Sequence, residues 1–254
     1  MEINKKTFIV TGAASGLGEA TARMIVERGG FAVLADINPA GDAIAKGLGE
    51  AACFVATDVT QEADGVRAVE AAKAKFGALH GLVNCAGIAP SERIAGRNGP
   101  HSLESFNRAV TINLVGTFNM LRLAANAMTS NDPMADGERG VIINTASVAA
   151  FEGQVGQVAY AASKAGVAGM TLPAARELSR FGIRVVTIAP GLFMTPMMAG
   201  FSHEVQDSLA QTVLFPQRLG KPEEFAELVA SICAQTMLNG ETIRLDGALR
   251  MAPK

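Results

Sequence analysis

The sequence is poor in cysteine and in charge of either sign. Its three cysteines, Cys53, Cys85 and Cys233, stand in apolar stretches without the spacing of metal ligands. We therefore expect reduced core thiols, no disulfide and no bound metal. Charged residues make up 18% of the 254 residues, and the net charge is -2. Because no stripe of lysine or arginine could follow a phosphate backbone, nucleic-acid binding is disfavoured.

Long apolar runs are missing as well. None reaches the roughly 18 to 20 residues that a membrane span needs, so we expect no membrane partner. Residues 1–6 lead directly into a strand-like run at 7–10, which leaves no room for a secretory or transit segment. This start favours the bacterial cytoplasm.

Hydrophobic residues, in contrast, make up 49% of the chain, enough for one large core. Short apolar runs alternate with longer stretches of helical spacing. The runs lie at 7–10, 31–35, 51–55, 82–84, 141–145, 183–189 and 242–245. We predict an α/β fold in one domain over 1–254, a Rossmann-like, doubly wound parallel sheet of about seven strands with helices on both faces. Such sheets bind ligands outside the carboxyl ends of their strands.

A glycine-rich turn follows the first predicted strand and opens onto an amphipathic helix. Residues 11–18 read TGAASGLG. Its glycines allow a pyrophosphate to approach the free N–H groups and the positive dipole end of the helix. A lone turn of this kind could simply cap a helix, but here strand, glycines and helix occur in register. The pattern favours a dinucleotide site.

Asp36 closes the second predicted strand, 18 residues after Gly18. A carboxylate at this place accepts hydrogen bonds from both ribose hydroxyls of the adenosine half and repels a 2′-phosphate. Its neighbours Ile37 and Asn38 carry no positive charge, so NAD is favoured over NADP. The alternative is a turn former at the strand end.

Two further loops follow strands on the same side. Asp58-Val59 comes after the third strand, and the segment 84–87, Asn-Cys-Ala-Gly, comes after the fourth. Both would lie near the adenine and its ribose. Asp58 could equally cap the helix that begins near Gln61.

Ser147, Tyr160 and Lys164 form the candidate catalytic set. The strand at 141–145 delivers Ser147 to the carboxyl edge of the sheet, and a helix beginning near Gln157 carries Tyr160 and Lys164 on one face. Lys164 would lower the pKa of the phenol from roughly 10 and bind the nicotinamide ribose. Ser147 would donate a hydrogen bond to the reacting oxygen. The alternative is a surface Tyr/Lys pair with a turn serine.

Asn113 lies midway along a predicted long helix, where asparagine has mediocre propensity. It could hold a water that links Lys164 to solvent as a proton exit. A buried asparagine that satisfies a helix bend is the alternative.

A methionine-rich stretch, 193–198, begins a predicted substrate flap around 192–215. Flexible thioethers can mould to an acyl chain or a flat steroid. A helix that packs on the core would show the same pattern.

In order along the chain, the motifs Thr-Gly-x3-Gly-x-Gly, Asn-x-Ala-Gly, Ser and Tyr-x3-Lys resemble those of the short-chain dehydrogenase/reductase family. Residues 140–157, 188–193 and 238–247 look like the type 2 3-hydroxyacyl-CoA dehydrogenases, also called type 10 17β-hydroxysteroid dehydrogenases. This resemblance implies NAD-linked interconversion of a 3-hydroxyacyl-CoA and a 3-ketoacyl-CoA by a homotetramer. It also implies hydroxysteroids as further substrates, and the mitochondrial matrix as the location in a eukaryote.

The resemblance also implies site residues. Ser147 and Tyr160 would contact the substrate, and Asn113 would serve the proton relay. The cofactor contacts would be Gly12, Ser15, Gly16, Leu17, Gly18, Asp36, Asp58, Val59, Asn84, Cys85, Ala86, Gly87, Tyr160, Lys164, Pro190, Gly191, Phe193 and Thr195. Cys85 departs from the asparagine of many members, with little effect expected because the contact would run through the backbone.

Three other functions remain open. A hydroxysteroid or other secondary-alcohol dehydrogenase would use the same catalytic set. A 3-oxoacyl-carrier-protein reductase would normally prefer NADPH, which Asp36 disfavours. A nucleotide-sensing or scaffolding protein would need the cofactor site without Ser147, Tyr160 and Lys164.

Overall fold

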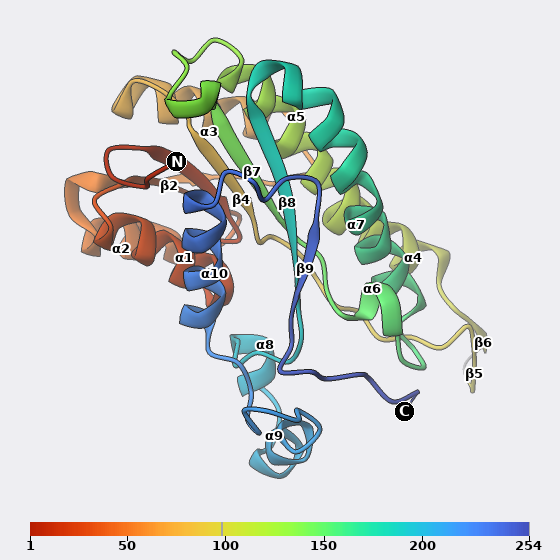
Figure 1. Ribbon diagram of the computed structural model, residues 1–254. Coiled ribbons are helices and arrows are strands. Elements are labelled where there is room, and N and C mark those ends of the chain that lie inside the picture. The colour runs from red at the N-terminus through yellow and green to blue at the C-terminus, as the bar shows by residue number, and fades with distance from the viewer. Residues whose placement is uncertain (98, 254) are drawn as a thin grey trace.

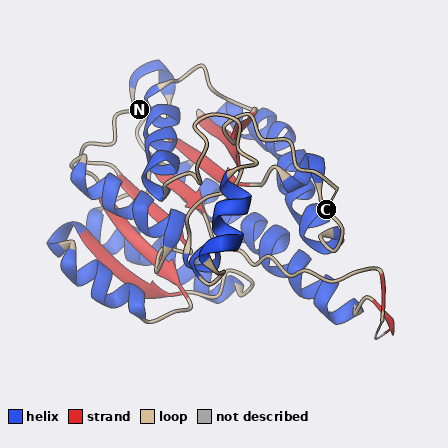
Figure 2. Ribbon diagram, turned by 90° about the horizontal axis from the view of Figure 1, so that it is seen from below, coloured by secondary structure: helices blue, strands red, loops and turns tan. Residues whose placement is uncertain are grey.

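The computed structural model describes residues 1–97 and 99–253 and confirms the predicted α/β architecture (Figures 1 and 2). Its main sheet is parallel, in the order β3-β2-β1-β4-β7-β8-β9. The strands are β1 Thr7–Thr11, β2 Phe31–Asp36, β3 Ala52–Ala56, β4 Gly81–Asn84, β7 Gly140–Thr145, β8 Ile183–Pro190 and β9 Thr242–Leu245. Each predicted strand agrees with the structure to within one residue at either end.

Helices cover both faces of this sheet (Figure 1). One face carries α1 Gly16–Glu27, α2 Ala40–Gly47 and α10 Pro222–Ala234, and the other carries α3 Glu62–Phe76, α5 Gly116–Met128 and α7 Val158–Leu178. Successive strand residues point to opposite faces. In β1, Phe8 and Val10 join one hydrophobic core, whereas Ile9 joins the other. The strands are therefore apolar on both faces.

The first helix ends at a pair of glycines, Gly29 and Gly30. α1 stops at Glu27, and Gly29 follows with φ +77°. The Gly29 N–H donates to the Val26 carbonyl and the Gly30 N–H to the Ile25 carbonyl, both at 2.9 Å. This is a Schellman termination, which glycine favours because the left-handed conformation strains other residues. It returns the chain to β2.

The strand order reverses next to β1. From β1 the chain proceeds outward to β2 and β3, then returns to β4 on the other side of β1 and continues outward to β9. The loops after β1 and β4 therefore diverge at the carboxyl edge, which leaves a crevice where ligands of doubly wound sheets bind.

The remaining elements are short. β5 Ala95–Gly96 and β6 Gly99–Pro100 form an antiparallel pair that projects from the body (Figure 1). The others are α4 Leu103–Val110, α6 Ala149–Glu152, α8 Pro196–Ala199, α9 His203–Ala210, the 3-10 turns η1 Gly49–Ala51, η3 Ala135–Gly137 and η4 Ser179–Phe181, and the π-helical η2 Thr111–Val115. In the described residues, no helix is both long and apolar enough to cross a bilayer.

His80 precedes β4 and is half-buried. The Thr7 N–H donates to its Nδ1 at 3.2 Å, so this nitrogen is unprotonated. Burial, aided by the charge of Lys6, lowers the pKa of His80 to about 4. Because the unfolded side chain titrates near roughly 6.5, the folded protein binds fewer protons between these values. The resulting stability is complete above that window and is lost as pH falls through it.

We therefore expect His80→Asn to weaken the acid sensitivity of folding. The amide oxygen can accept the Thr7 N–H without titrating, so between pH 7 and pH 4.5 the free energy of unfolding should fall less in the variant than in the wild type. Urea unfolding at a series of pH values measures this difference. Parallel pH profiles for the two proteins would contradict it.

Candidate active site

The glycine turn after β1 meets the loop after β4 through bare backbone. Gly12 has φ +65°, and a Cβ built on it would lie 2.8 Å from the backbone nitrogen of Ala86. A Cβ on Gly18 would lie 2.2 Å from the Gly12 carbonyl oxygen. Any side chain at either position would separate the two loops or open the turn. These glycines therefore hold the cradle together.

The start of α1 fits an anion. Ser15 precedes the helix in an extended conformation, and within the described residues its side chain makes no capping hydrogen bond. The first N–H groups of α1 thus remain available to a pyrophosphate. A Cβ built on Gly16 would lie 3.3 Å from Pro196 Cδ and 3.6 Å from Thr195 Cβ. The structure therefore places Thr195 against the turn, with Leu17 one residue into the helix.

Asp36 stands at the carboxyl end of β2, as predicted. Its Oδ2 accepts from the Ala14 N–H and its Oδ1 from the Asn38 N–H, both at 2.9 Å. These two bonds orient the half-buried carboxylate beside the glycine turn, and each oxygen retains a lone pair for a ribose hydroxyl. The geometry suits both a ribose acceptor and a turn former.

Asp58 does not cap α3. The N-cap is Gln61, whereas Asp58 Oδ1 accepts from the Thr60 N–H at 2.9 Å and from the Thr60 hydroxyl at 2.7 Å. The carboxylate thus closes a tight turn before the helix. Val59, next along the chain, is buried. This arrangement keeps the loop after β3 compact.

The segment 84–87 is fixed from both sides. The Thr11 hydroxyl accepts from the Cys85 and Ala86 N–H groups, each at 3.1 Å, and Asn84 Nδ2 donates to Asn144 Oδ1 at 3.0 Å. Burial raises the pKa of the Cys85 thiol to about 12, so this side chain stays neutral. The sequence did not predict this role of Thr11, although the residue begins the glycine motif, because a single threonine forms no recognisable pattern.

Ser147, Tyr160 and Lys164 converge at the carboxyl end of β7. Ser147 is buried and its Oγ accepts from the Ala149 N–H at 3.1 Å. The Lys164 ammonium is buried too, donates to the Thr145 carbonyl at 2.8 Å, and lies 5.9 Å from the Tyr160 ring centroid. The structure thus brings the whole candidate set together.

Burial governs the two titrating groups of this set. It raises the pKa of Tyr160, with a side-chain hydrogen bond to Ser147 acting in the opposite direction. Burial also lowers the pKa of Lys164 to about 8. We expected Lys164 to lower the pKa of Tyr160, but in this structure the shift is upward. The physical reason is that burial of the phenol outweighs the interactions that favour the phenolate.

Asn113 braces two elements. It is fully buried in the π-helical turn η2, which interrupts the predicted continuous helix between α4 and α5. Its Oδ1 accepts from the Ile88 N–H at 2.8 Å, and its Nδ2 donates to the Ile88 carbonyl at 2.8 Å and to Ser163 Oγ at 2.9 Å. The side chain therefore ties the loop after β4 to α7, in agreement with a buried asparagine at a helix irregularity.

The end of β8 joins the catalytic segment to the flap. The Val148 N–H donates to the Pro190 carbonyl at 3.0 Å, and the Gly191 N–H donates to the Leu245 carbonyl at 2.9 Å. Phe193 is buried and pairs with Gly220 in an isolated bridge. The cofactor candidates Pro190, Gly191 and Phe193 are thus structurally anchored.

The predicted flap contains α8 and α9, and part of its apolar surface faces solvent. Exposed fractions are 39% for Met194, 50% for Phe201 and 42% for Val205. These side chains are only partly buried against the core, so an apolar ligand can contact them.

A family model described as short chain dehydrogenase matches residues 6–206. The chain belongs to the short-chain dehydrogenases. It is therefore an oxidoreductase, and the dinucleotide cradle described above fits the nicotinamide cofactor of such chemistry. The family predicted from the motifs is confirmed.

Individual members of the family extend this similarity. The 3-hydroxyacyl-CoA dehydrogenase type-2 of Drosophila melanogaster is 54% identical over 254 residues, which cover 99% of this chain and 100% of that protein. A crystal structure of 3-hydroxyacyl-CoA dehydrogenase type-2 from Mycobacterium avium has a TM-score of 0.94 at 44% identity, covering 98% of this chain and 97% of that one.

A third relative differs in its named substrate. The crystal structure of 3-ketoacyl-(acyl-carrier-protein) reductase from Brucella melitensis complexed with NADH has a TM-score of 0.87 at 31% identity and covers 98% of this chain and 100% of that one. The three proteins share one fold with this short-chain dehydrogenase over nearly its whole length.

The brace formed by Asn113 is testable through stability. We expect Asn113→Leu to lower the free energy of unfolding by about 2 to 4 kcal/mol, because the N–H and carbonyl of Ile88 lose their partner in a buried setting. Urea denaturation gives the value. Ser163→Ala leaves both bonds to Ile88 intact and removes the bond from Asn113 and the bond to the Tyr160 carbonyl, so it should cost less, about 1 kcal/mol. Equal effects of the two substitutions would show that the bonds to Ile88 add nothing.

Proposed function

We propose that this chain is an NAD-dependent dehydrogenase that interconverts a 3-hydroxyacyl-CoA and a 3-ketoacyl-CoA. The observation that carries the proposal is the convergence of Ser147, Tyr160 and Lys164 beside the dinucleotide cradle. The full-length similarity to proteins named 3-hydroxyacyl-CoA dehydrogenase type-2 supports this substrate class.

The residues divide the work of the reaction. A bound nicotinamide supplies the hydride acceptor or donor. In the reductive direction the Tyr160 hydroxyl gives its proton to the carbonyl oxygen of the substrate, and in the oxidative direction the phenolate takes it back. Ser147 donates a hydrogen bond to the same oxygen and stabilises the negative charge that develops there.

Lys164 serves both partners. Its ammonium would hold the ribose of a bound nicotinamide cofactor, and it keeps a positive charge 5.9 Å from the centre of the Tyr160 ring. The raised pKa of Tyr160 keeps the phenol protonated at neutral pH in the free protein, which suits proton donation during reduction. Asn113 is proposed to support a relay that replenishes this proton through Lys164, since it braces the helix that carries both residues.

The preference for NAD follows from Asp36. Its carboxylate is held at the end of β2 by two backbone N–H groups, and a 2′-phosphate beside it would meet an uncompensated negative charge. The same contact argues against an NADPH-linked reductase of carrier-protein substrates. A 3-oxoacyl-carrier-protein reductase is still the second candidate, because the chain is similar to the Brucella reductase. The structure of that reductase holds NADH.

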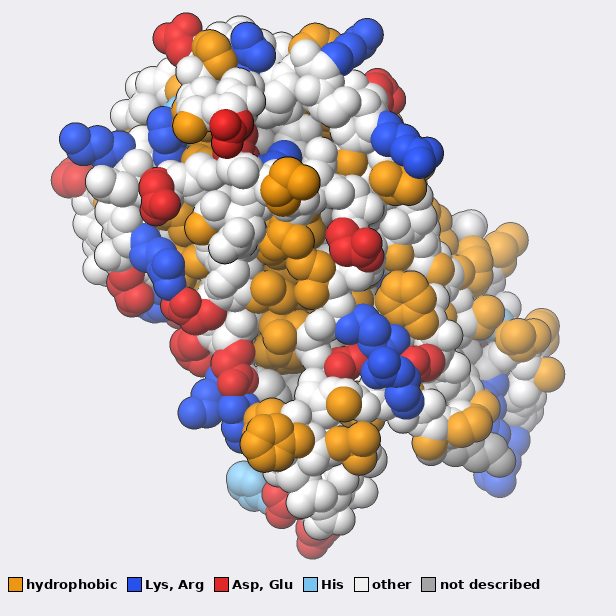
Figure 3. Space-filling view, in the orientation of Figure 1, with side chains coloured by type: hydrophobic (Ala, Val, Ile, Leu, Met, Phe, Trp, Pro, Cys, Tyr) orange, Lys and Arg blue, Asp and Glu red, His pale blue; other side chains and the backbone are white. Residues whose placement is uncertain are grey.

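Assembly as a homotetramer is proposed from the exposed apolar surface. β9 forms one end of the sheet, and Figure 3 shows hydrophobic side chains gathered over this edge, between α10 and α7. A hollow of about 650 Å³ beside it is lined mainly by small and apolar residues, with two charged ones at Glu241 and Arg244; the others are Ala150, Phe151, Ala165, Ala168, Gly169 and Thr242. A second copy of the chain would remove this surface from water.

A reducing compartment is part of the proposal. Cys53, Cys85 and Cys233 are all free thiols, which suits the bacterial cytoplasm or, in a eukaryote, the mitochondrial matrix.

Asp36→Ala should weaken NADH binding at least about ten-fold, because the hydrogen bonds to the ribose hydroxyls are lost. NADPH binding should weaken far less, because the substitution also removes the repulsion between the carboxylate and the 2′-phosphate. Titration of nicotinamide fluorescence measures both affinities. Asp42→Ala removes an exposed carboxylate from the neighbouring α2 and serves as the control. Equal losses for both cofactors would refute the ribose role of Asp36.

The substrate assignment is tested by the initial rate of NADH oxidation with acetoacetyl-CoA, compared with a steroid ketone and a carrier-protein ester. We expect the CoA ester to be reduced fastest. If the steroid ketone or the carrier-protein ester is reduced faster than acetoacetyl-CoA, the substrate assignment moves to that class.

Tyr160→Phe should lower kcat by about a thousand-fold or more while NADH binding stays within about two-fold, because only the proton donor is lost. If the Tyr160→Phe variant stays active, the proposed role of Tyr160 as proton donor is wrong.

A further inference from the structure

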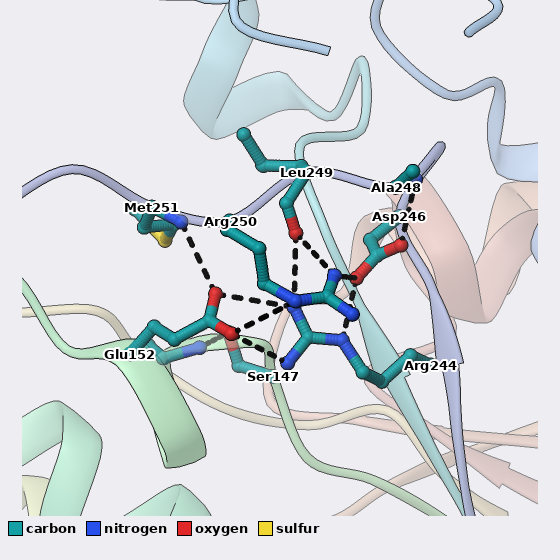
Figure 4. Close-up of polar contacts among 9 residues, drawn as sticks. Ser147, Glu152, Arg244, Asp246, Ala248, Leu249, Arg250 and Met251 are labelled. Carbon is teal, nitrogen blue, oxygen red and sulfur yellow. Dashed lines mark hydrogen bonds and ion pairs between the residues drawn. The ribbon is translucent and has the colours of Figure 1, made fainter. Parts of the chain in front are cut away.

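A cluster of opposite charges lies outside the catalytic set and joins parts of the chain far apart in sequence (Figure 4). Arg244 in β9 meets the Glu152 carboxylate with both terminal nitrogens, Nη1 to Oε1 at 3.0 Å and Nη2 to Oε2 at 3.1 Å. Its Nε donates to Asp246 Oδ2 at 2.7 Å. With a further bond from Nη2 to the Leu249 carbonyl, the guanidinium donates four hydrogen bonds, a geometry that lysine cannot reproduce.

This cluster is partly shielded from water. Exposed fractions of the side chains are 22% for Arg244, 24% for Glu152 and 8% for Asp246, against 61% for the outer partner Arg250. Charge pairs that are partly desolvated and bidentate are worth more than ordinary surface pairs. Although partial burial acts against it, hydrogen bonds from Arg244 and from the Met251 N–H hold the pKa of Glu152 below its usual range.

The cluster fastens the C-terminal tail, residues 246–253, to the catalytic segment 147–160. Glu152 Oε2 accepts from the Met251 N–H at 3.1 Å, and Arg244 Nη2 donates to the Leu249 carbonyl at 3.0 Å. Farther along, Gln154 Nε2 donates to the Ala252 carbonyl at 2.9 Å. The tail therefore runs along the stretch that links Ser147 to Tyr160.

The other end of the tail touches the flap. The Phe215 N–H donates to the Gly247 carbonyl at 3.2 Å, and a Cβ built on Gly247 would lie 2.5 Å from Val213 Cγ1. Gly191, which follows β8, approaches Asp246 so closely that a Cβ on it would lie 2.9 Å from Asp246 Cα. The tail thus contacts both the catalytic segment and the flap, whereas Gly12 and Asp36 of the cofactor cradle lie at the ends of β1 and β2.

We infer that Arg244 and Glu152 form a latch that docks the C-terminal tail between the catalytic segment and the flap, and thereby sets the affinity for the acyl-CoA substrate. Both are positioning residues, which act through the segment they hold. The inference rests on the proposed function for its substrate. Among the described residues, Arg244 and Glu152 contact neither Gly12 nor Asp36, so the larger effect is expected on the acyl-CoA and the smaller one on the cofactor.

The test uses Arg244→Gln and Glu152→Gln in the full-length protein. Each should raise KM for acetoacetyl-CoA about ten-fold, while KM for NADH and kcat stay within about two-fold. The effects of the two substitutions should not multiply in the double variant, because both remove the ion pair between Arg244 and Glu152. Arg244→Lys, which keeps the charge without the bidentate contact, should fall between wild type and Arg244→Gln. Arg23→Gln, which breaks an exposed pair with Glu19 on α1, is the matched control.

A second readout does not depend on turnover. Hydrogen exchange followed by mass spectrometry should show faster exchange of the Met251 amide in both Gln variants, together with the Val155 amide, which donates to the Pro253 carbonyl. Unchanged exchange would overturn the latch. Faster exchange with an unchanged KM for acetoacetyl-CoA would overturn its role in substrate affinity. If the wild type fails to reduce acetoacetyl-CoA, the proposed substrate is wrong, and the exchange data still decide whether the latch exists.

Discussion

The site depends on one close approach, between the backbone of Gly12 and the backbone of the loop after β4. With no Cβ at Gly12, the turn that starts α1 lies against Ala86, and Thr11 ties the two together through its hydroxyl. This contact closes the crevice at the point where the strand order reverses. A methyl group at Gly12 would separate the helix start from the loop, and the phosphate and nicotinamide ends of a dinucleotide would no longer share one continuous surface.

Burial then supplies the chemistry that composition alone does not. The Lys164 side chain is almost completely enclosed, and its pKa falls to about 8 for that reason. An amine with such a value exchanges protons readily near neutrality. In the described part of the chain its ammonium donates to one protein group, the Thr145 carbonyl. The site is thus preorganised by its walls before any ligand arrives.

Local signals in the sequence carry most of the fold. The seven strands and the end of α1 could be predicted because apolar periodicity and glycine act over a few residues. The family was equally accessible, because its motifs lie within short windows around Gly12, Tyr160 and Lys164. The π-helical turn at Asn113 was not predicted, because it depends on partners at Ile88 and Ser163 that only the folded chain brings near. The pairing of Arg244 with Glu152 was not predicted either, because the two residues are 92 positions apart and no local sequence pattern joins them.

The order of the strands also separates two tasks in space. The cradle for the dinucleotide is built on β1, β2 and β4, whereas the flap and the C-terminal tail extend from β8 and β9 at the other end of the sheet. Insertions or substitutions in the tail would change the proposed substrate surface without displacing the glycine turn, which the flap meets only through Thr195 and Pro196 among the neighbours of Gly16. For evolution or for engineering, the substrate is therefore a property of one edge of the sheet, and the chain can exchange one secondary alcohol for another while its redox partner stays the same.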